Sequence, residues 1–493
     1  MARLRTSHFL SVLPSSSSPV QSQNKKRFWP RTVLAAVVIA LVFFVFRFHP
    51  PVPPPEVPAP NQLDKLEPQL RDYLAEKIKW TREEPRDFHR QATLGMVYAA
   101  NSLWREAQRA FRNAAKLNPR EPLAALYVAI STQEMGEYEE ALGEFRQLTL
   151  RFPDFPQGFY RLGEAALRGG LLDEAEPAFQ RLMALAPREW RGYAGLGDVN
   201  LRKGNFPDAT ALLEKAVELD PEAKVAHHLL GQAYRGLGRI EDARLHLALG
   251  VSQTRNFMED DWSQTVSQHA KLVQDQMEIA SEYSAAGQSA KAEEILSQAL
   301  PYQPENLTLI NALAIVYNRS GRPDKARAVL LNVLQKDARY LPALVTLSHS
   351  CADLGLNDDA LNYANRAIEL GPSVVQTYLA KANALLAAGR DSEALEALEA
   401  ANRCDPQNAE IQIELGDVCL LNLRRTKDAL AHYETALKLN PVLVPVYVRL
   451  ADLHMHLGRS KDAQTDLETL RKISPRMPDL VALEARLRKL ANP

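Results

Sequence analysis

The sequence contains few of the residues that enzymes and metal proteins use for their chemistry. Only 3 cysteines occur among 493 residues, and they form no close-spaced motif, so neither a zinc site nor a disulfide framework is expected. No glycine-rich phosphate loop, nucleophile elbow or paired-histidine zinc motif is present. His227 and His228 are adjacent, and His454 and His456 are two apart, so neither pair shares one helix face as a metal site would need. We therefore expect no enzymatic activity, no catalytic residue, no metal and no cofactor.

The chain also lacks an excess of either charge. Its 59 Lys and Arg and 60 Asp and Glu residues give a formal net charge of -1. The strongly basic balance that nucleic-acid binding requires is therefore missing. We expect partners that are proteins or peptides, and neither nucleic acid nor a small-molecule substrate.

One long apolar run lies near the N-terminus. The stretch from Thr32 to Phe46 has no charge and no helix breaker, and counted from Trp29 to Phe48 it would reach about 30 Å as a helix, enough to span a bilayer. Residues 1–31 are basic without an acidic residue and are expected to be a disordered cytoplasmic tail. We predict a transmembrane signal anchor at 32–48 in a single-pass membrane protein. Positive charge at its N-terminal side would keep the N-terminus in the cytoplasm and place the rest of the chain in the periplasm or another extracytoplasmic space.

Two other interpretations of the apolar run stay open. A buried core helix fits poorly, because the run is apolar on all sides and lies between a basic tail and a proline-rich stretch. A cleaved signal peptide is the stronger alternative, although Arg47 to Pro51 offers no small-residue cleavage site. Residues 49–60 are rich in proline and are predicted to form an extended stalk; a proline ligand for another domain is the alternative. Residues 61–87 are predicted to be a helical lead-in that covers the helices expected from Phe88 onwards.

A pattern of small and large apolar residues repeats every thirty-four residues from Phe88 onwards. Its spacing within one period places the apolar positions on one face of each of two helices, so the unit is a helical hairpin. A fixed period of this size indicates a repeat architecture. In the stretch from Phe88 to Glu121 the marker residues are Leu94, Gly95, Tyr98, Ala107, Phe111, Ala114 and Pro119.

The copies fall into two blocks. Block 1 covers residues 88–255 and block 2 covers residues 273–475, with one extra residue between Leu420 and Asp428. Between the blocks, an insertion at 256–272 contains acidic and aromatic residues. It is either a functional insertion on one face of the array or a longer connection whose aromatic residues cover the junction. Residues 476–493 are predicted to be a C-terminal capping helix.

The marker residues resemble those of the tetratricopeptide repeat (TPR) family, and about eleven copies cover residues 88–475. This resemblance implies an all-α fold. It would be an α-solenoid, a right-handed superhelix of antiparallel helix pairs, here preceded by one N-terminal transmembrane helix. In the family, the concave face is lined mainly by the first helix of each pair and binds peptides or partner proteins.

The resemblance also assigns inward-facing positions to particular residues. Several arginines fall on one strip in the third to fifth units, which would favour an acidic or carboxylate-bearing peptide; a solvated charged surface is the alternative. The family's carboxylate clamp for chaperone tails is not matched, because its lysine positions are Ala92, Leu126 and Tyr160. The candidate peptide-binding groove consists of Tyr160, Glu164, Arg168, Arg191, Asp198, Arg202, His228, Gln232, Arg235, Asn311, Asn318, Asn383 and Asp417.

Anchor, stalk and groove together indicate a non-enzymatic protein–protein interaction scaffold. We expect a membrane-tethered TPR array that binds peptide segments or partner proteins, for example during assembly of an envelope complex. A cytosol-facing, membrane-anchored adaptor or co-chaperone is the first alternative. An accessory subunit of a glycosyltransferase or a protease is an alternative of another class.

Overall fold

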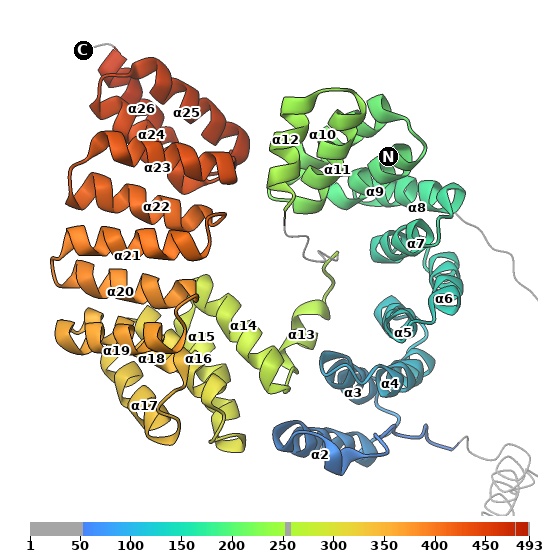
Figure 1. Ribbon diagram of the computed structural model, residues 1–493. Helices are drawn as coiled ribbons and strands as arrows, with labels where there is room; N and C mark the ends of the chain where they lie inside the picture. The colour runs from blue at the N-terminus through green and yellow to red at the C-terminus, as the bar shows by residue number, and fades with distance from the viewer. Residues whose placement is uncertain (1–52, 252–257, 479, 492–493) are drawn as a thin grey trace, which may run out of the picture. The chain divides into compact units, whose positions relative to one another are not determined.

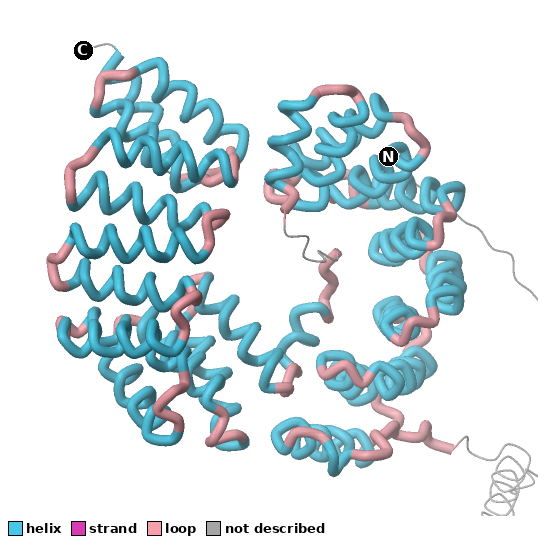
Figure 2. The backbone as a smooth tube through the Cα atoms, viewed as in Figure 1, coloured by secondary structure: helices cyan, strands magenta, loops and turns pink. Residues whose placement is uncertain are grey.

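The computed structural model describes residues 53–251, 258–478 and 480–491. All regular structure in these ranges is helical, and none of these residues forms a strand, as Figure 2 shows. The chain divides into two units, Met1–Pro54 and Pro55–Pro493, and all the repeats belong to the second. The predicted anchor at 32–48 lies outside the described residues. Among the described helices, none combines the length and the apolar character that crossing a membrane requires.

Eleven helix pairs follow one another along the described part of the second unit (Figure 1). Block 1 consists of α3 (Phe88–Ala100) with α4 (Trp104–Leu117), α5 (Pro122–Glu134) with α6 (Tyr138–Arg151), α7 (Pro156–Arg168) with α8 (Leu172–Leu185), α9 (Trp190–Arg202) with α10 (Phe206–Leu219), and α11 (Lys224–Gly236) with α12 (Ile240–Leu249). The short helix α13 (Ser263–Gln268) lies between the blocks.

Block 2 repeats the same plan. It consists of α14 (Val273–Ala285) with α15 (Ser289–Ala299) and the 3₁₀ turn η2 (Leu300–Tyr302), α16 (Leu307–Arg319) with α17 (Pro323–Lys336), α18 (Leu341–Asp353) with α19 (Asn357–Leu370), α20 (Val375–Ala387) with α21 (Asp391–Cys404), α22 (Ala409–Asp417) with α23 (Thr426–Leu439), and α24 (Val444–His456) with α25 (Ser460–Ile473). These pairs confirm the prediction of an all-α solenoid of helical hairpins.

Small residues let the two helices of a pair approach each other. A Cβ atom added to Gly95 would lie 2.6 Å from the ring of Phe111, so only glycine leaves room for that ring. Phe111 and Tyr98 are both fully buried. The ring of Phe111 also lies 5.2 Å from that of Tyr127 in the second pair, so it fills the space between neighbouring pairs.

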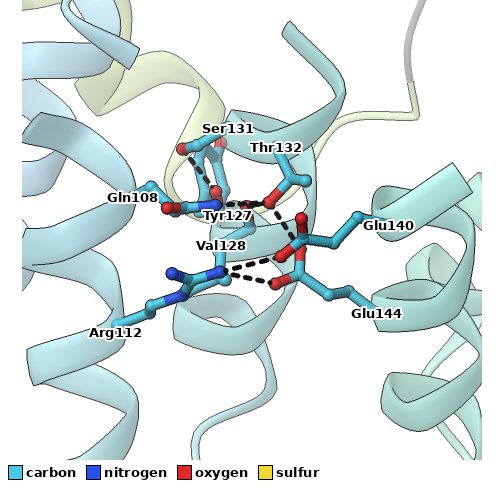
Figure 3. A network of polar contacts seen from close by, with 8 residues as sticks. All are labelled: Gln108, Arg112, Tyr127, Val128, Ser131, Thr132, Glu140 and Glu144. Atoms are coloured by element: carbon cyan, nitrogen blue, oxygen red, sulfur yellow. Dashed lines mark hydrogen bonds and ion pairs between the residues drawn. The ribbon is translucent and has the colours of Figure 1, made fainter. Parts of the chain in front are cut away.

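A polar network joins the first two pairs (Figure 3). Thr132 occupies the position where the first pair has Tyr98, and its hydroxyl accepts a hydrogen bond from Gln108 of α4 (2.7 Å) and donates to Glu144 of α6 (2.6 Å). Arg112 reaches the same Glu144 at 3.1 Å. The second unit therefore has no packed ring at this position. Instead, Thr132 takes part in a hydrogen-bond network that connects three helices.

Two helical elements precede the first pair. After the turn η1 (Leu63–Lys65), α2 (Pro68–Glu83) buries Leu70, Leu74 and Ile78 in the same hydrophobic cluster as the first pairs. Pro68 begins this helix, because a proline at the first helical position loses no intrahelical hydrogen bond.

The stalk prediction at 49–60 needs a correction for its last residues. The hydroxyl of Tyr98 donates to the carbonyl of Pro58 (2.7 Å), and the amide of Asn113 donates to the carbonyl of Glu56 (2.8 Å). Val57 and Ala59 pack against the cluster of the first pairs. Residues 56–59 therefore lie on the first pair and are not a free spacer, because the buried Tyr98 hydroxyl finds its acceptor there.

One irregularity lies within block 2, and one further helix follows it. The extra residue expected between Leu420 and Asp428 is taken up by a π-helical turn, η3 (Val418–Asn422), which continues α22. The predicted capping helix is α26 (Leu480–Ala491), whose Leu480 and Leu483 are buried in one cluster with α24 and α25. Leu245 and Leu249 of α12 pack against this same cluster.

Candidate peptide-binding face

The first helices of block 1 hold a segment of the chain's own insertion. We call the surface that α3, α5 and α7 share the first-helix face, and residues 258–272 the inserted segment. The amide of Gln157 in α7 donates to the carbonyl of Glu259 at 3.5 Å, Asp260 meets Tyr127 of α5, and α13 packs on α3. The inserted segment therefore crosses the three first helices in reverse order (Figure 1).

Trp262 is the aromatic anchor of the inserted segment. Its ring stacks on Phe111 with centroids 5.9 Å apart and an interplanar angle of 21°. It also lies 5.4 Å from the ring of Tyr127 and 6.4 Å from that of Phe88. Two helix pairs thus supply an aromatic floor for one indole, an arrangement that adds a geometric preference to the burial of apolar area.

Asp260 adds a charged contact beside this floor. Its carboxylate accepts a hydrogen bond from the Tyr127 hydroxyl, at 3.2 and 3.3 Å to the two oxygens, and from the backbone N–H of Trp262 at 2.8 Å. Burial, and then the negative charge of Asp260, raises the pKa of Tyr127, so the phenol keeps its proton and donates it. One carboxylate therefore binds the face and fixes the turn that begins α13.

A buried arginine lies behind this carboxylate. Desolvation lowers the pKa of Arg161, and the surrounding Tyr160, Tyr127, Glu164 and Asp260 oppose that shift. The guanidinium and the Asp260 carboxylate are therefore close enough to attract each other.

Asn101 binds the backbone of the inserted segment. Its amide nitrogen donates to the carbonyl of His269 (2.9 Å), and its amide oxygen accepts from the N–H of Lys271 (2.8 Å). The hydroxyl of Tyr73 hydrogen-bonds Nδ1 of His269 at 2.7 Å. Side-chain amides that pair with both backbone groups of a peptide are typical of peptide recognition, since they hold the chain without depending on its sequence.

The sequence-predicted groove residues of the third and fourth pairs lie close together, and they carry both positive and negative charges. Arg202 makes two hydrogen bonds to Asp198, at 2.9 and 3.1 Å, and a third to the carbonyl of Leu167 at 2.8 Å. Burial raises the pKa of Glu164, and Arg168 is the first of several nearby arginines that oppose the rise. This strip therefore contains internal ion pairs between its arginines and acids.

Tyr160 and Arg191 flank that strip. Tyr160 is only 6% exposed, and burial raises the pKa of its hydroxyl. Arg191 pairs with Glu189 at 2.7 Å. Both side chains are less exposed than that of Arg168.

The fifth pair and block 2 contribute separate groups. Gln232 and His228 hydrogen-bond each other at 2.6 Å, and Arg235 is exposed nearby on α11. Asn311 is buried on α16, and Asn383 is exposed on α20. These two asparagines lie on different first helices of block 2 and form no cluster with the residues of block 1.

Two further predicted groove residues are used within the array. Asn318 accepts a hydrogen bond from Ser350 of the next first helix at 3.0 Å. Asp417 receives two bonds from Arg449, at 2.6 and 2.7 Å, and one from Tyr433 at 2.6 Å. They link neighbouring pairs to each other.

The residues that hold the inserted segment, Phe88, Asn101, Phe111 and Tyr127, were not among the sequence-predicted groove positions. Phe111 was recognised only as a repeat marker. The available signal was the acidic and aromatic composition of the insertion, which indicated a contact but not its target. Among the described residues, the three cysteines are free and no group of three or more His, Cys, Asp or Glu side chains could hold a metal ion.

Several curated proteins are similar to parts of this chain. Tetratricopeptide repeat protein 8 of Caenorhabditis elegans is 22% identical over 253 residues, which is 50% of this chain and 49% of that protein. Anaphase-promoting complex subunit 7 of Arabidopsis thaliana is 28% identical over 135 residues (27% of this chain, 24% of that protein). Protein STIP1 homolog of Dictyostelium discoideum is 41% identical over 70 residues (14% and 12%). The chain spans about half or less of the length of these relatives.

Solved structures are also similar to parts of the chain. A thermophilic TPR protein of Thermus thermophilus is 21% identical and covers 37% of this chain and 98% of its own, with a TM-score of 0.35. PilF of Pseudomonas aeruginosa is 17% identical and covers 43% of this chain and 96% of its own, with a TM-score of 0.33.

Family profiles match most of the array. One profile described as Tetratricopeptide repeat matches residues 129–189 and 346–409. A second profile with the same description matches residues 200–263, 283–348 and 420–487. Together they cover more than half of the chain, and most of the helix pairs described above fall within them. The chain belongs to the tetratricopeptide repeat family.

Proposed function

We propose that this protein is a non-enzymatic scaffold whose first helices bind peptide segments of partner proteins. TPR-containing proteins generally mediate protein–protein interactions, and this chain belongs to that family. One observation carries the proposal: the first two helix pairs already hold a peptide segment by an aromatic stack, a carboxylate contact and two side-chain bonds to the backbone. A surface that binds one such segment has the chemistry to bind another.

We assign the partner to the strip that continues along the third to fifth pairs. Arg168, Arg202 and Arg235 lie there, with Glu164 and Asp198 beside them. A partner segment that carries carboxylates could take over the arginine bonds that now go to Asp198, because guanidinium groups bind carboxylates with two parallel hydrogen bonds.

Site-specific crosslinking in cells tests this proposal. A photo-reactive amino acid replaces Arg168 or Arg235, and a matched control replaces Gln180, which is exposed on the second helix α8. We expect partner proteins to be captured from the first two positions and not from the third. Equal capture from all three positions would contradict binding at the first helices.

A variant with Arg168, Arg191, Arg202 and Arg235 replaced by Ala tests the chemistry of the strip. We expect crosslinking with mass spectrometry to show the loss of the partners that the intact chain captures. Unchanged partners would remove the carboxylate-bearing ligand from the proposal, while the crosslinks from Arg168 and Arg235 would still decide whether the face binds protein at all.

We further propose that residues 32–48 tether the array to a membrane and that the array lies on the extracytoplasmic side, where it helps to assemble an envelope complex. The asymmetry of basic residues around the apolar run supports this orientation. In protease digestion of inside-out membrane vesicles, which expose the cytoplasmic side, we expect only the N-terminus to be digested and the array to be protected. Digestion of the array from that side, or a C-terminal reporter active in the cytosol, would favour the cytosol-facing adaptor instead.

A further inference from the structure

We propose that residues 258–266 are an internal ligand of the first-helix face, and that the partner segment which displaces them carries the same chemistry, a carboxylate two residues before a tryptophan. This inference rests on the proposed function. It specifies which kind of peptide binds, and it states that the face is occupied by the chain's own segment before a partner binds. It comes from the contacts of Asp260 and Trp262 with α3, α4 and α5.

The inserted segment is not needed to continue the array. Turn residues with positive φ recur at one period from Gly204 to Gly238 and again from Gly287 to Gly321, whereas Gly238 and Gly287 are about fifteen residues further apart than a period. The other pairs follow each other with short turns. The extra length lies on the first-helix face, where it joins no helix pair.

The face that receives the segment is formed by the repeats themselves. The ring of Phe111 packs against Gly95 within the first pair and lies 5.2 Å from the ring of Tyr127 in the second pair. Their positions follow from packing between the pairs, so the aromatic floor would persist if the inserted segment left. A preformed site of this kind binds a peptide without the cost of ordering itself first.

The recognised element is short and specific. The carboxylate of Asp260 reaches both Tyr127 and the N–H groups of Trp262 and Ser263, at 2.8 and 3.0 Å for the latter two. This turn sets the indole on the aromatic floor. An acidic residue, any residue and a tryptophan at the start of a helical turn therefore fit the face. Asp261 between them is exposed.

The internal ligand is poised for exchange. Asp260, Trp262 and Val266 are only partly buried, and Glu259 and Asp261 are exposed. A tethered ligand has an effective concentration on the order of millimolar. The apparent affinity for a separate peptide of the same sequence is therefore reduced, by a factor set by the ratio of occupied to open face in the free protein. A partner with additional contacts along the third to fifth pairs would overcome this competition.

Calorimetric titration of the full chain in detergent tests the inference, with a synthetic peptide of residues 258–271 as the probe. We expect weak binding to the unaltered chain. The double variant Asp260→Asn with Trp262→Ala should bind the peptide at least about tenfold more tightly, because its own segment no longer fills the face. Addition of Tyr127→Phe to this double variant should weaken the gain, since the peptide's carboxylate loses its donor.

Matched variants separate this effect from a change in folding. Asp261→Asn removes the neighbouring exposed carboxylate and should leave the affinity unchanged. Trp262→Phe keeps a ring on the floor and should give an intermediate gain. Hydrogen exchange of α3 and α5 checks that the repeats remain folded. Affinities are compared only among variants in which these two helices exchange as they do in the unaltered chain.

Equal affinity of the unaltered chain and the double variant for the peptide would overturn the internal ligand. Absence of peptide binding to a folded double variant would overturn it as well. The crosslinks at Arg168 and Arg235 are independent of this result: if they persist, the proposed scaffold function stands without the internal ligand, and if they vanish, the proposed function itself fails.

Discussion

At the scale of single residues, the fold depends on which glycines face a ring and which face open space. Cβ atoms built on Gly163 and Gly195 would lie 2.6 and 2.3 Å from the ring of Phe179, which is fully buried between them. A Cβ atom on Gly143 of α6 would have no neighbour within 4 Å. The same chemical change should therefore have opposite effects at these positions.

We predict that Gly163→Ala destabilises the array by about 1–3 kcal/mol, because the trapped ring of Phe179 cannot move aside. Gly143→Ala, the matched control, should stabilise it by about 0.5–1 kcal/mol through the lower backbone entropy of the unfolded chain. Urea denaturation with hydrogen exchange of α7 and α8 measures both. Adding Phe179→Leu should recover part of the loss, and failure to do so would contradict the packing explanation.

His269 should give the inserted segment a dependence on pH. Desolvation, followed by the positive charges of Lys271 and Lys77, lowers the pKa of His269 from its ordinary value of 6.5 to about 4. The unfolded chain therefore binds a proton on this ring near pH 6.5, while the folded chain does so only near pH 4. Its contribution to stability is complete above the first value and is lost as the pH falls toward the second.

We predict that this loss amounts to about 1 kcal/mol, less than the full shift implies, because solvent screens a partly exposed ring. The variant His269→Gln should show a smaller decrease in thermal midpoint between about pH 7.5 and about pH 4.5 than the unaltered chain does. His89→Gln, at a histidine outside the inserted segment, is the control and should keep the full decrease. An unchanged decrease in His269→Gln would contradict the assignment.

At the scale of helices and turns, one backbone conformation recurs in every pair. The turn between the two helices contains a residue with positive φ, and it is glycine in nine pairs, from Gly136 (φ 84) to Gly458 (φ 69). Ser102 (φ 59) and Arg424 (φ 57) occupy this position in the first and tenth pairs. A side chain in this left-handed region costs energy that glycine avoids.

We predict that Arg424→Gly stabilises the tenth pair by about 1 kcal/mol. Gly389→Ala, the reverse change in the ninth pair, should destabilise by a similar amount. Thermal denaturation followed by circular dichroism, with hydrogen exchange of α22 and α23, tests the first change. If Arg424→Gly lowers the stability of these helices, contacts of the arginine side chain outweigh the backbone strain.

Most of the elements could be predicted from the sequence, because each hairpin repeats the same local pattern. Pro119 marked the end of α4 one residue beyond its cap, and the extra residue near Leu420 indicated the irregularity that became η3. The inserted segment could not be predicted in this way. Its contacts join residues such as Asn101 and His269, which are 168 positions apart, and no local periodicity encodes a contact over that distance.

For the candidate site, family positions located the strip around Arg202 but not the pairing of its side chains. Asp198 lies one helical turn before Arg202, and α7 brings the carbonyl of Leu167 near the same side chain. These two neighbours determine whether the guanidinium is available to a ligand. Positions along a helix predict which face a residue occupies. They do not predict which of several neighbours binds it.

At the scale of the whole array, stability is the sum of contacts between neighbouring pairs. The last pair is completed by α26, where Leu480 and Leu483 are 6% and 5% exposed. The same cluster receives Leu245 and Leu249 of α12, which are far away in sequence. Arg476 also donates to the carbonyl of Leu219 at 3.2 Å. The end of block 1 and the end of block 2 therefore share one cluster.

We predict that Leu480→Ser with Leu483→Ser raises the hydrogen exchange of α24 and α25 and, through the shared cluster, of α12. The helices α3 to α8 should exchange as before, because their contacts lie elsewhere. Val481→Ser, at a side chain that is 74% exposed, is the control. Unchanged exchange in α12 would show that its leucines do not depend on the C-terminal helices.

The stacked indole of Trp262 also makes the array its own optical reporter. Tryptophan emission changes in wavelength and intensity with the polarity of its surroundings, and this ring lies between aromatic neighbours and solvent. In a chain whose other tryptophans, Trp29, Trp80, Trp104 and Trp190, are replaced by Phe, the remaining signal comes from the inserted segment alone. Candidate partners could then be ranked, without labels, by the red shift that they cause when they expel it.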